Sequence, residues 1–323
     1  MTLLISEKDV RELLTMRDAI AAVEEVTRRQ AAGKAIVQPR HRLELPDKGF
    51  LHYMAGADVD ASLVGMKLYT SVRGALRFLV PLYRSSTGEL LALIEAEHLS
   101  MMRTGAASGV ATRFMARQDA KTLAVIGSGL QARGQIEAVA AVRNLADVRV
   151  FSRNAERRAK FAGEMEELLE IPVTPADSAQ AAVHNADIVV TATTANRPVV
   201  EGGWIAPGTH VNAIGANFPH KRELDDAFIR RLRYAVVDFT EQAKIEAGDL
   251  IQAFAAGAGD WTSVHELSEI VAGKFQGRES VNETTLFKSS GIAIWDIAVA
   301  AKVYDLAVAK GKGVPIPLWE QKS

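Results

Sequence analysis

The stretch Thr122–Ala132, which reads TLAVIGSGLQA, constrains the fold of this chain more than any other feature. A short apolar run ends in two glycines, Gly127 and Gly129, and a segment with helical character follows over 130–145. Gly127 permits a tight bend, Gly129 lets the backbone approach a pyrophosphate, and Ala132 allows the helix to pack closely on the strand. The N–H groups at the start of such a helix attract an anionic ligand. The spacing predicts a dinucleotide-binding turn; the alternative is a tight strand-to-helix turn that binds nothing.

The region after position 120 alternates between short apolar runs and helix-like segments. The expected strands are 123–126, 148–151, 188–192, 210–214 and 234–237. Strands that alternate with helices form parallel sheets that are covered on both faces. We therefore expect an α/β fold of the Rossmann type, with a doubly wound parallel sheet.

The region before position 120 has a different pattern. Ser6 with Asp9, and Thr15 with Asp18, indicate capped helix starts. Consecutive strands are expected at 37–45, 50–57, 64–72, 76–83 and 90–96, followed by a helix over 99–116. Consecutive strands joined by short turns pair antiparallel. This part is expected to be an N-terminal α+β domain with an antiparallel sheet.

The change of pattern predicts two domains. The dinucleotide-binding domain is expected over 119–291, and the first domain over 1–118. A long helix with apolar periodicity over 290–309 follows the nucleotide domain. We expect it to return to the first domain, so that 292–323 complete that domain.

The composition excludes several classes of protein. A formal net charge of −1 gives no electrostatic case for binding nucleic acid or an anionic membrane, and the absence of cysteine excludes disulfides and thiol chemistry. No apolar run reaches the roughly 20 residues of a membrane span, and the start of the chain lacks the pattern of a signal peptide. We therefore expect a soluble cytoplasmic protein. The histidines lack metal-ligand spacing and no nucleophile elbow is present, so neither a metal site nor hydrolase chemistry is expected.

Seven segments, which occur in the same order along the chain, resemble the ornithine cyclodeaminase/mu-crystallin family, and the likeness covers nearly the whole chain. These segments are Gln38–Arg40, Gly65–Leu68, Met102–Ala106, Gly127–Gln131, Asn212–Ala216, Arg222–Asp225 and Thr285–Gly291. The resemblance implies a substrate and dimerisation domain beside a Rossmann domain, a nicotinamide cofactor, a small imino- or amino-acid substrate, and a homodimer.

The resemblance assigns three cations, Arg40, Lys67 and Arg103, to the α-carboxylate of the substrate. A planar guanidinium holds a carboxylate through two parallel hydrogen bonds, and a lysine adds a compact charge and a proton donor near the imine nitrogen. Taken singly, each is also readable as a solvated surface charge. Met66 and Met102 beside Lys67 and Arg103 favour a partly buried setting, where a cation needs an anionic partner.

Asn217 is where the chain departs from the cyclodeaminase branch of the family, which has an aspartate at this position. That carboxylate takes up protons during deamination, whereas an asparagine does not titrate and cannot act as a general base. Asn217 can still hydrogen-bond a substrate nitrogen or a cofactor amide, so we count it with Lys67 and Arg103 as a catalytic candidate. The alternative is an asparagine selected for a loop before Pro219.

The choice of cofactor is predicted from the end of the second strand of the nucleotide domain. NAD-specific domains place an acid there for the ribose 2′-hydroxyl. This chain has Ser152 and Arg153 instead, with Arg157 and Arg158 close behind. Because no acid repels a 2′-phosphate and Arg153 can pair with one, NADP(H) is favoured over NAD(H). The alternative is an ordinary charged start of a helix.

Further cofactor contacts come from the resemblance alone. They are expected at Thr104, Leu130, Gln131, Thr191, Thr193, Ile214 and Ser290, in addition to the glycine turn. The two threonines come at the carboxyl end of an expected parallel strand, which is where ligands bind in such sheets.

These observations predict an NAD(P)H-dependent reductase of α-imino acids, of the ketimine or iminosuccinate type, or an amino-acid dehydrogenase acting reductively. One alternative is a cyclodeaminase with bound NAD, and another is a protein that binds a small carboxylate in an NADPH-dependent manner. An iminosuccinate needs a cation for its second carboxylate. Arg73, Arg77 or the basic segment 220–222 are candidates, and surface charges are the alternative.

Overall fold

The computed structural model describes residues 2–46 and 49–318. It divides into two compact units, one of Met1–Arg103 with Gly291–Ser323 and the other of Thr104–Ser290. Helix α3 (Glu97–Met115) spans the first division, and the boundary expected after position 118 lies just beyond this helix. The expected first domain also includes residue 1, 47–48 and 319–323, which lie outside the described part of the chain.

The first unit contains a run of strands that follows two helices. Its elements besides α3 are β1 (Thr2–Ile5), α1 (Glu7–Leu13), α2 (Met16–Ala31), β2 (Ala35–Val37), β3 (His41–Glu44), β4 (Phe50–Asp58), β5 (Leu63–Val72), β6 (Ala75–Arg84), β7 (Leu90–Glu95), α11 (Ala293–Lys310) and β16 (Val314–Ile316). Both predicted helix caps form. Ser6 and Asp9 make a capping box at α1, and the Thr15 side chain accepts a hydrogen bond from the Asp18 amide at α2.

The sheet of the first unit has the order β16-β1-β7-β6-β5-β4-β2, with β3 also paired to β4. The pairs are antiparallel except β1 with β7, so the antiparallel prediction is confirmed for this unit. The strand expected over 37–45 is instead two short strands, β2 and β3, which both pair with β4. Pro39 lies between them and has no N–H to donate, so one continuous strand cannot form there. The edge strand β16 and its neighbour β1 were not predicted.

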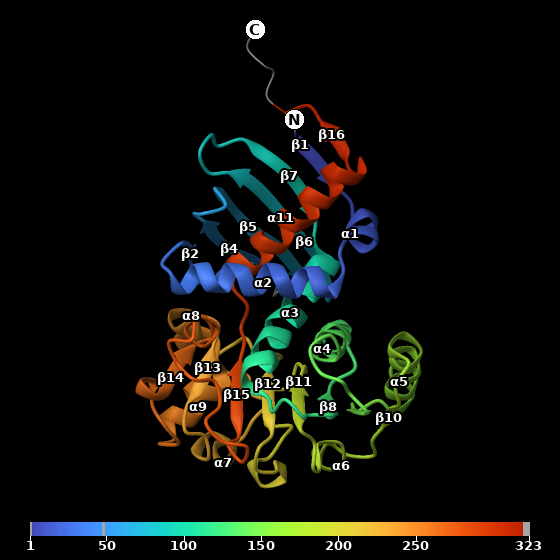
Figure 1. The fold of residues 1–323 in the computed structure, drawn as a ribbon, viewed down its shortest axis with the longest axis vertical. Helices are drawn as coiled ribbons and strands as arrows, with labels where there is room; N and C mark the ends of the chain where they lie inside the picture. Colours follow the sequence, from blue (N-terminus) through green and yellow to red (C-terminus); the bar gives the residue numbers. More distant parts are fainter. Residues whose placement is uncertain (1, 47–48, 319–323) are drawn as a thin grey trace. The chain divides into compact units, whose positions relative to one another are not determined.

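Helices α2 and α11 cover one face of this sheet (Figure 1). Met54 of β4 faces α11 in an apolar cluster with Ile297, and Lys67 of β5 lies directly opposite Met54 in the strand register. Because residues directly opposite each other on neighbouring antiparallel strands point to the same face, Lys67 also lies on the helix-covered face. Tyr53 and Leu68, the next pair in the register, point to the other face.

The second unit alternates strands and helices. Its elements are β8 (Thr122–Ile126), α4 (Leu130–Ala140), β9 (Asp147–Phe151), α5 (Ala155–Leu169), β10 (Val173–Pro175), α6 (Ala179–Val183), β11 (Ile188–Thr191), β12 (His210–Ala213), α7 (Asp226–Arg230), β13 (Ala235–Val237), α8 (Thr240–Glu246), α9 (Gly248–Ala255), β14 (Val264–Glu266), α10 (Leu267–Val271) and β15 (Thr285–Lys288), with short 3-10 turns at Gly202–Trp204 and Trp261–Ser263.

The sheet of the second unit is parallel throughout its described pairs, with the order β10-β9-β8-β11-β12-β15-β13-β14. Separate apolar cores lie on its two faces, one around Val125 and Val190 and the other around Val189 and Val211. This is the doubly wound arrangement expected from the sequence. Strands β10, β14 and β15 were not predicted, and β15 enters the sheet between β12 and β13.

Within the described residues, no helix has the length and apolar character that a membrane span requires. In the same part of the chain, no group of His, Asp and Glu side chains is arranged to hold a metal ion.

Candidate functional site

Lys67 is buried in the first unit, with 2% of its surface exposed. It is held in the centre of β5, and its Nζ lies 3.2 Å from Oδ1 of Asp296. The same ammonium donates a hydrogen bond to the hydroxyl of Ser100 on α3. The rings of Phe78 and Tyr69 lie 5.1 and 5.7 Å from Nζ, which is within the range of cation–π attraction. Lys67 is therefore a fixed internal cation and not a solvated surface charge.

Arg103 is also buried and contacts the same carboxylate. Its Nε donates to Asp296 Oδ1 at 3.0 Å. Gly291 lies against the guanidinium: a Cβ at this glycine would come within 2.5 Å of Arg103 Nη1, and its φ of +83° is unfavourable for other residues. Arg40, on the segment between β2 and β3, donates from Nη2 to the carbonyl of Gly291 at 3.5 Å. The three predicted cations therefore converge on the short segment 291–296.

Asp296 belongs to this cluster but was not predicted from the sequence. It lies in the first turn of α11, is fully buried, and accepts both Lys67 and Arg103 on one oxygen. Its other oxygen, Oδ2, accepts no hydrogen bond from any residue that the structure describes. An acid in the apolar run Gly291–Ala301 was the available signal, because a buried carboxylate needs a cationic partner. Among the described residues, two cations here share one carboxylate, so the cluster can accept a second anion.

Burial and the neighbouring Arg103 lower the pKa of Lys67 to about 7, although Asp296 acts in the opposite direction. Lys67 therefore gains and loses its proton near neutral pH. His52, on β4, stacks on Tyr69 with ring centroids 4.2 Å apart. Burial, with Arg42 and Arg40 nearby, lowers the pKa of His52 to about 4, so this histidine is neutral when Lys67 titrates.

The glycine turn of the second unit has the conformation that its sequence predicts. Gly127 has a φ of +128°, and a Cβ there would collide with the carbonyl of Ala192. Gly129 is the N-cap of α4 in an extended conformation, and no side chain of the described residues caps the helix. A Cβ on Gly129 would meet nothing within 4 Å. The start of α4 thus combines open space with amide groups that no side chain caps, which fits a bound pyrophosphate.

The end of β9 presents Arg153 to solvent. Ser152 is held by two hydrogen bonds. Its hydroxyl lies 2.9 Å from that of Ser128, and its carbonyl accepts from Arg158 at 2.6 Å. Asn154 caps α5 by accepting from the Arg157 amide. Arg158 is therefore committed to its own strand end, whereas Arg153 is exposed.

The remaining predicted cofactor residues lie in the second unit and fall into two groups. Leu130 and Gln131 start α4, and Thr104 accepts from the Gln135 side chain through its carbonyl at 3.1 Å. The others lie at the carboxyl ends of β11, β12 and β15: Thr191 is the last residue of β11, and Thr193, Ile214 and Ser290 come after the strands. Asn217, predicted as a catalytic candidate, also follows β12. These strands are neighbours in the sheet, so their loops meet at one edge.

The hydroxyls of Thr191 and Thr193 donate to Glu223, and Thr191 is completely buried. Asn217 and Ile214 are partly buried. Of the cations considered for a second carboxylate, Arg222 is engaged by Asp226 at 2.6 Å, and Arg77 is exposed.

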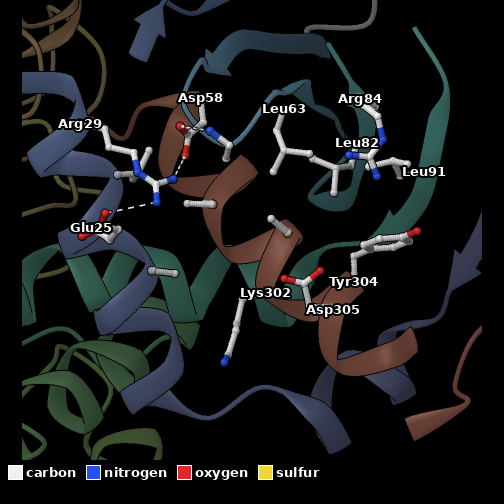
Figure 2. A pocket seen from close by; sticks show the side chains of 15 residues that line it. Glu25, Arg29, Asp58, Leu63, Leu82, Arg84, Leu91, Lys302, Tyr304 and Asp305 are labelled. Atoms are coloured by element: carbon white, nitrogen blue, oxygen red, sulfur yellow. Dashed lines mark hydrogen bonds and ion pairs between the residues drawn. The ribbon is translucent and has the colours of Figure 1, made fainter. Parts of the chain in front are cut away.

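A separate cavity of about 370 Å³ lies in the first unit between α2, α11 and the sheet (Figure 2). Leu63, Leu82 and Leu91 line it together with charged residues such as Arg84 and Asp305. It lies further along α11 than Asp296, and none of the predicted site residues lines it.

The chain is similar in sequence to named proteins along nearly its whole length. The chain is 36% identical over 324 residues to the alanine dehydrogenase of Archaeoglobus fulgidus, covering 98% of each chain. It is also 36% identical over 320 residues to a Δ1-pyrroline-2-carboxylate reductase of Bacillus cereus, covering 96% of this chain and 98% of the reductase.

Two solved structures extend this likeness to the fold. The Δ1-pyrroline-2-carboxylate reductase of Thermococcus litoralis, solved with NADH and L-proline, is 39% identical, with a TM-score of 0.94 over 97% of this chain and 100% of that one. An archaeal alanine dehydrogenase, solved as a dimer with bound NAD, is 35% identical, with a TM-score of 0.92 over 98% and 99% of the two chains. The model of one family matches residues 1–311. The chain therefore belongs to the ornithine cyclodeaminase/mu-crystallin family.

Proposed function

We propose that this protein is an NAD(P)H-dependent reductase of α-imino acids, or an amino-acid dehydrogenase that acts in the reductive direction. The observation that carries the proposal is the buried cluster in which Lys67 and Arg103 share Asp296. The carboxylate of an imino acid supplies the second anion that this cluster can accept. The names of the relatives support the same chemistry, since they include reductases of a cyclic imino acid and an alanine dehydrogenase.

In the proposed reaction, Arg40 and Arg103 bind the substrate carboxylate, and Asp296 holds Arg103 and Lys67 in place. Lys67 keeps a proton available at its Nζ for the imine nitrogen, because its pKa of about 7 makes that proton easy to release. Burial of these groups excludes water, which strengthens their attraction for the carboxylate. The bound nicotinamide supplies the hydride in this chemistry.

Gly127, Gly129 and the start of α4 are the proposed holders of the cofactor pyrophosphate. Leu130, Gln131, Ser152, Thr193, Ile214 and Ser290 are proposed to line the rest of the cofactor site, with Thr104 and Thr191. We propose NADP(H) over NAD(H), because Arg153 is exposed where NAD-specific domains carry an acid. The solved relatives carry NADH or NAD, so both cofactors need to be compared directly.

Asn217 argues against ornithine cyclodeamination in this chain. An amide side chain at this position does not take up protons, whereas reduction of a preformed imine needs only a bound carboxylate, a proton donor and a reductant. We propose that Asn217 hydrogen-bonds the substrate or the cofactor.

We also propose a homodimer formed through the sheet face that carries Tyr53 and Leu68. Tyr53 is 39% exposed on this face, which α2 and α11 do not cover. A sheet face with apolar side chains that α2 and α11 leave uncovered can pack against another layer, and the archaeal relative was solved as a dimer. Light scattering after size exclusion tests this, and we expect Leu68→Asp to convert the dimer to monomer. A monomeric parent protein would rule the dimer out.

One assay tests the proposed function. NADPH and NADH absorbance is followed with Δ1-pyrroline-2-carboxylate, with pyruvate plus ammonia or methylamine, and with oxaloacetate plus ammonia. Oxidation of either cofactor is the expected result. Ammonia release from ornithine without net redox change would instead indicate a cyclodeaminase. Binding of an imino acid without turnover would instead indicate a protein that sequesters its ligand.

A further inference from the structure

Glu223 gathers hydrogen bonds from two loops at the carboxyl edge of the parallel sheet. Its Oε1 accepts from the amide and the hydroxyl of Thr193 at 2.7 and 2.8 Å. Its Oε2 accepts from the hydroxyl of Thr191 at 2.9 Å and from the amides of Gly215 and Ala216 at 2.8 and 3.3 Å. One carboxylate thus joins the loop that follows β11 to the loop that follows β12.

Burial raises the pKa of Glu223, while Lys288 and the hydrogen bonds from Thr193 act in the opposite direction. The ionised carboxylate suits the hydrogen-bond geometry of this position because it only accepts hydrogen bonds. The amides of Thr193, Gly215 and Ala216 are fixed donors that cannot be reversed. Glu223 is fully buried, so any donor that it failed to satisfy would also lack water. A glutamine of the same size would turn an NH₂ group toward at least one of these amides.

Two further buried side chains, Asp249 and Lys288, hold the backbone around Glu223 and Ala216. Asp249 Oδ1 accepts from the backbone amides of Glu223 and Leu224 at 2.6 and 2.9 Å, and its Oδ2 lies 3.1 Å from Lys288 Nζ. Lys288 in turn donates to the carbonyl of Ala216 at 2.6 Å. The backbone of Ala216 is therefore held through its N–H by Glu223 and through its C=O by Lys288.

The two loops also touch directly at Gly215. A Cβ at Gly215 would overlap the backbone of Thr193 and come within 2.5 Å of Glu223 Oε1. Position 217, the Asn217 of the proposed site, follows this clamped segment without an intervening flexible residue.

We propose that Glu223 is a positioning residue that holds the loops after β11 and β12 as one rigid unit and thereby fixes Thr193 and Asn217 for cofactor and substrate. Glu223 itself touches neither ligand. The kinetic consequences of this role rest on the proposed function, whereas the effect on the loops does not.

The test compares Glu223→Gln with Glu201→Gln, which makes the same chemical change at an exposed position of the same unit. Hydrogen exchange of peptides covering 191–196 and 213–218, and calorimetric affinities for NADH and NADPH, are measured without any imine. We expect Glu223→Gln to speed local exchange and to weaken the cofactor about tenfold, with kcat falling by about a hundredfold because the loops lose their geometry. Glu201→Gln should match the parent protein.

A double-mutant cycle with Asn217→Ala separates positioning from general destabilisation. If Glu223 fixes Asn217, the Asn217→Ala change costs less activity in the Glu223→Gln protein than in the parent. Additive effects on kcat, or a Glu223→Gln protein that loses unfolding free energy while exchange in both peptides and cofactor affinity stay unchanged, would overturn the proposal.

If Glu223→Gln does not fold, the same measurements are made on Thr191→Val. It removes one buried donor to Glu223 and preserves the side-chain shape, so it should produce a smaller change of the same kind. Because Thr191 is itself proposed for the cofactor site, exchange in the two peptides decides this test, and unchanged exchange in Thr191→Val would then overturn the proposal. If the parent protein reduces no imine while these variants still loosen both loops, the proposed function fails and the positioning role stands.

Discussion

The two units each bury an ionic cluster, and the clusters have opposite composition. In the first unit, Lys67 and Arg103 share the single carboxylate of Asp296, one oxygen of which accepts no hydrogen bond from the described residues. In the second unit, two buried carboxylates, Glu223 and Asp249, lie near the single ammonium of Lys288, which pairs with Asp249 and acts on Glu223 electrostatically. Backbone amides donate to both oxygens of Glu223 and to Oδ1 of Asp249, while Oδ2 of Asp249 has the ion pair with Lys288 and no hydrogen bond from the described part of the chain. Among the described residues, the donors to Asp296 are side chains alone.

The difference separates a binding role from a supporting role. A buried charge needs a partner, and the protein supplies one for every carboxylate oxygen of Glu223. The cationic cluster is left with positive charge in excess, and a ligand carboxylate can balance it. The following experiments test this contrast, from the largest expected effect to the smallest.

Asp296→Asn should have the largest effect, because it leaves the buried Lys67 and Arg103 without their shared anion. We expect the free energy of unfolding to fall by about 3–5 kcal/mol, measured by urea denaturation. Asp305→Asn, at an exposed position of the same helix, is the matched control and should change stability by less than about 0.5 kcal/mol. Equal effects of the two changes would show that Asp296 does not hold the cations.

Arg103→Ala should separate substrate binding from cofactor binding. We expect KM for the imine to rise and kcat to fall, with kcat/KM lower by about a hundredfold or more, because a charged hydrogen-bond donor to the carboxylate is lost. Affinity for the cofactor should change little. Arg113→Ala, on the exposed side of the same helix, is the control. Unaltered kinetics in Arg103→Ala would remove Arg103 from the site.

The titration of Lys67 should appear in the pH profile of the reaction. With the pKa of Lys67 near 7, the proton is present below that pH, so kcat/KM for the imine should fall about tenfold per pH unit above it. This fall is the alkaline limb of the pH profile. For kcat the limb should lie at higher pH than for kcat/KM, because the carboxylate of the bound substrate stabilises the charged form of Lys67. Lys67→Arg should abolish the limb, since arginine does not titrate in this range. A limb that persists in Lys67→Arg belongs to another group.

The same pKa has a consequence for stability. The folded chain loses the Lys67 proton near pH 7, whereas the unfolded chain keeps it until the ordinary lysine value of 10.5. Within that window the unfolded chain binds more protons, so the contribution of Lys67 to the free energy of unfolding increases with pH.

Arg153→Ala should have the smallest effect, because an exposed cation is screened by water. We expect NADPH affinity to fall about tenfold and NADH affinity to stay within about twofold, measured by calorimetry. The matched control is Arg157→Ala, at an exposed position in the first turn of α5, and it should leave both affinities unchanged. Equal losses for NADPH and NADH in Arg153→Ala would refute a 2′-phosphate contact.

The sequence predicted the parts of the site that local patterns encode. The glycine turn gave Gly127 and Gly129 with the conformations expected, and the apolar neighbours of Lys67 and Arg103 pointed to burial. The role of Asp296 was not predicted, because its partners Lys67 and Arg103 lie far away in the sequence. A single acid in an apolar helix does not indicate which cations it contacts.

Long-range arrangement accounts for the other omissions. Glu223 lies in a segment that the family resemblance singled out, but its role depends on loops that only the assembled sheet brings together. The place of β15 between β12 and β13 was not predictable either, because the order of parallel strands depends on how the crossovers pack and not on the strands themselves.

Gly291 combines two restrictions that a selection experiment can read separately. Its φ of +83° disfavours every residue with a side chain, and the Arg103 guanidinium fills the volume that a side chain would need. Gly33 has a similar φ of +71° but open space around it. In a library randomised at both codons, asparagine should be recovered at position 33, while position 291 should return to glycine among active clones.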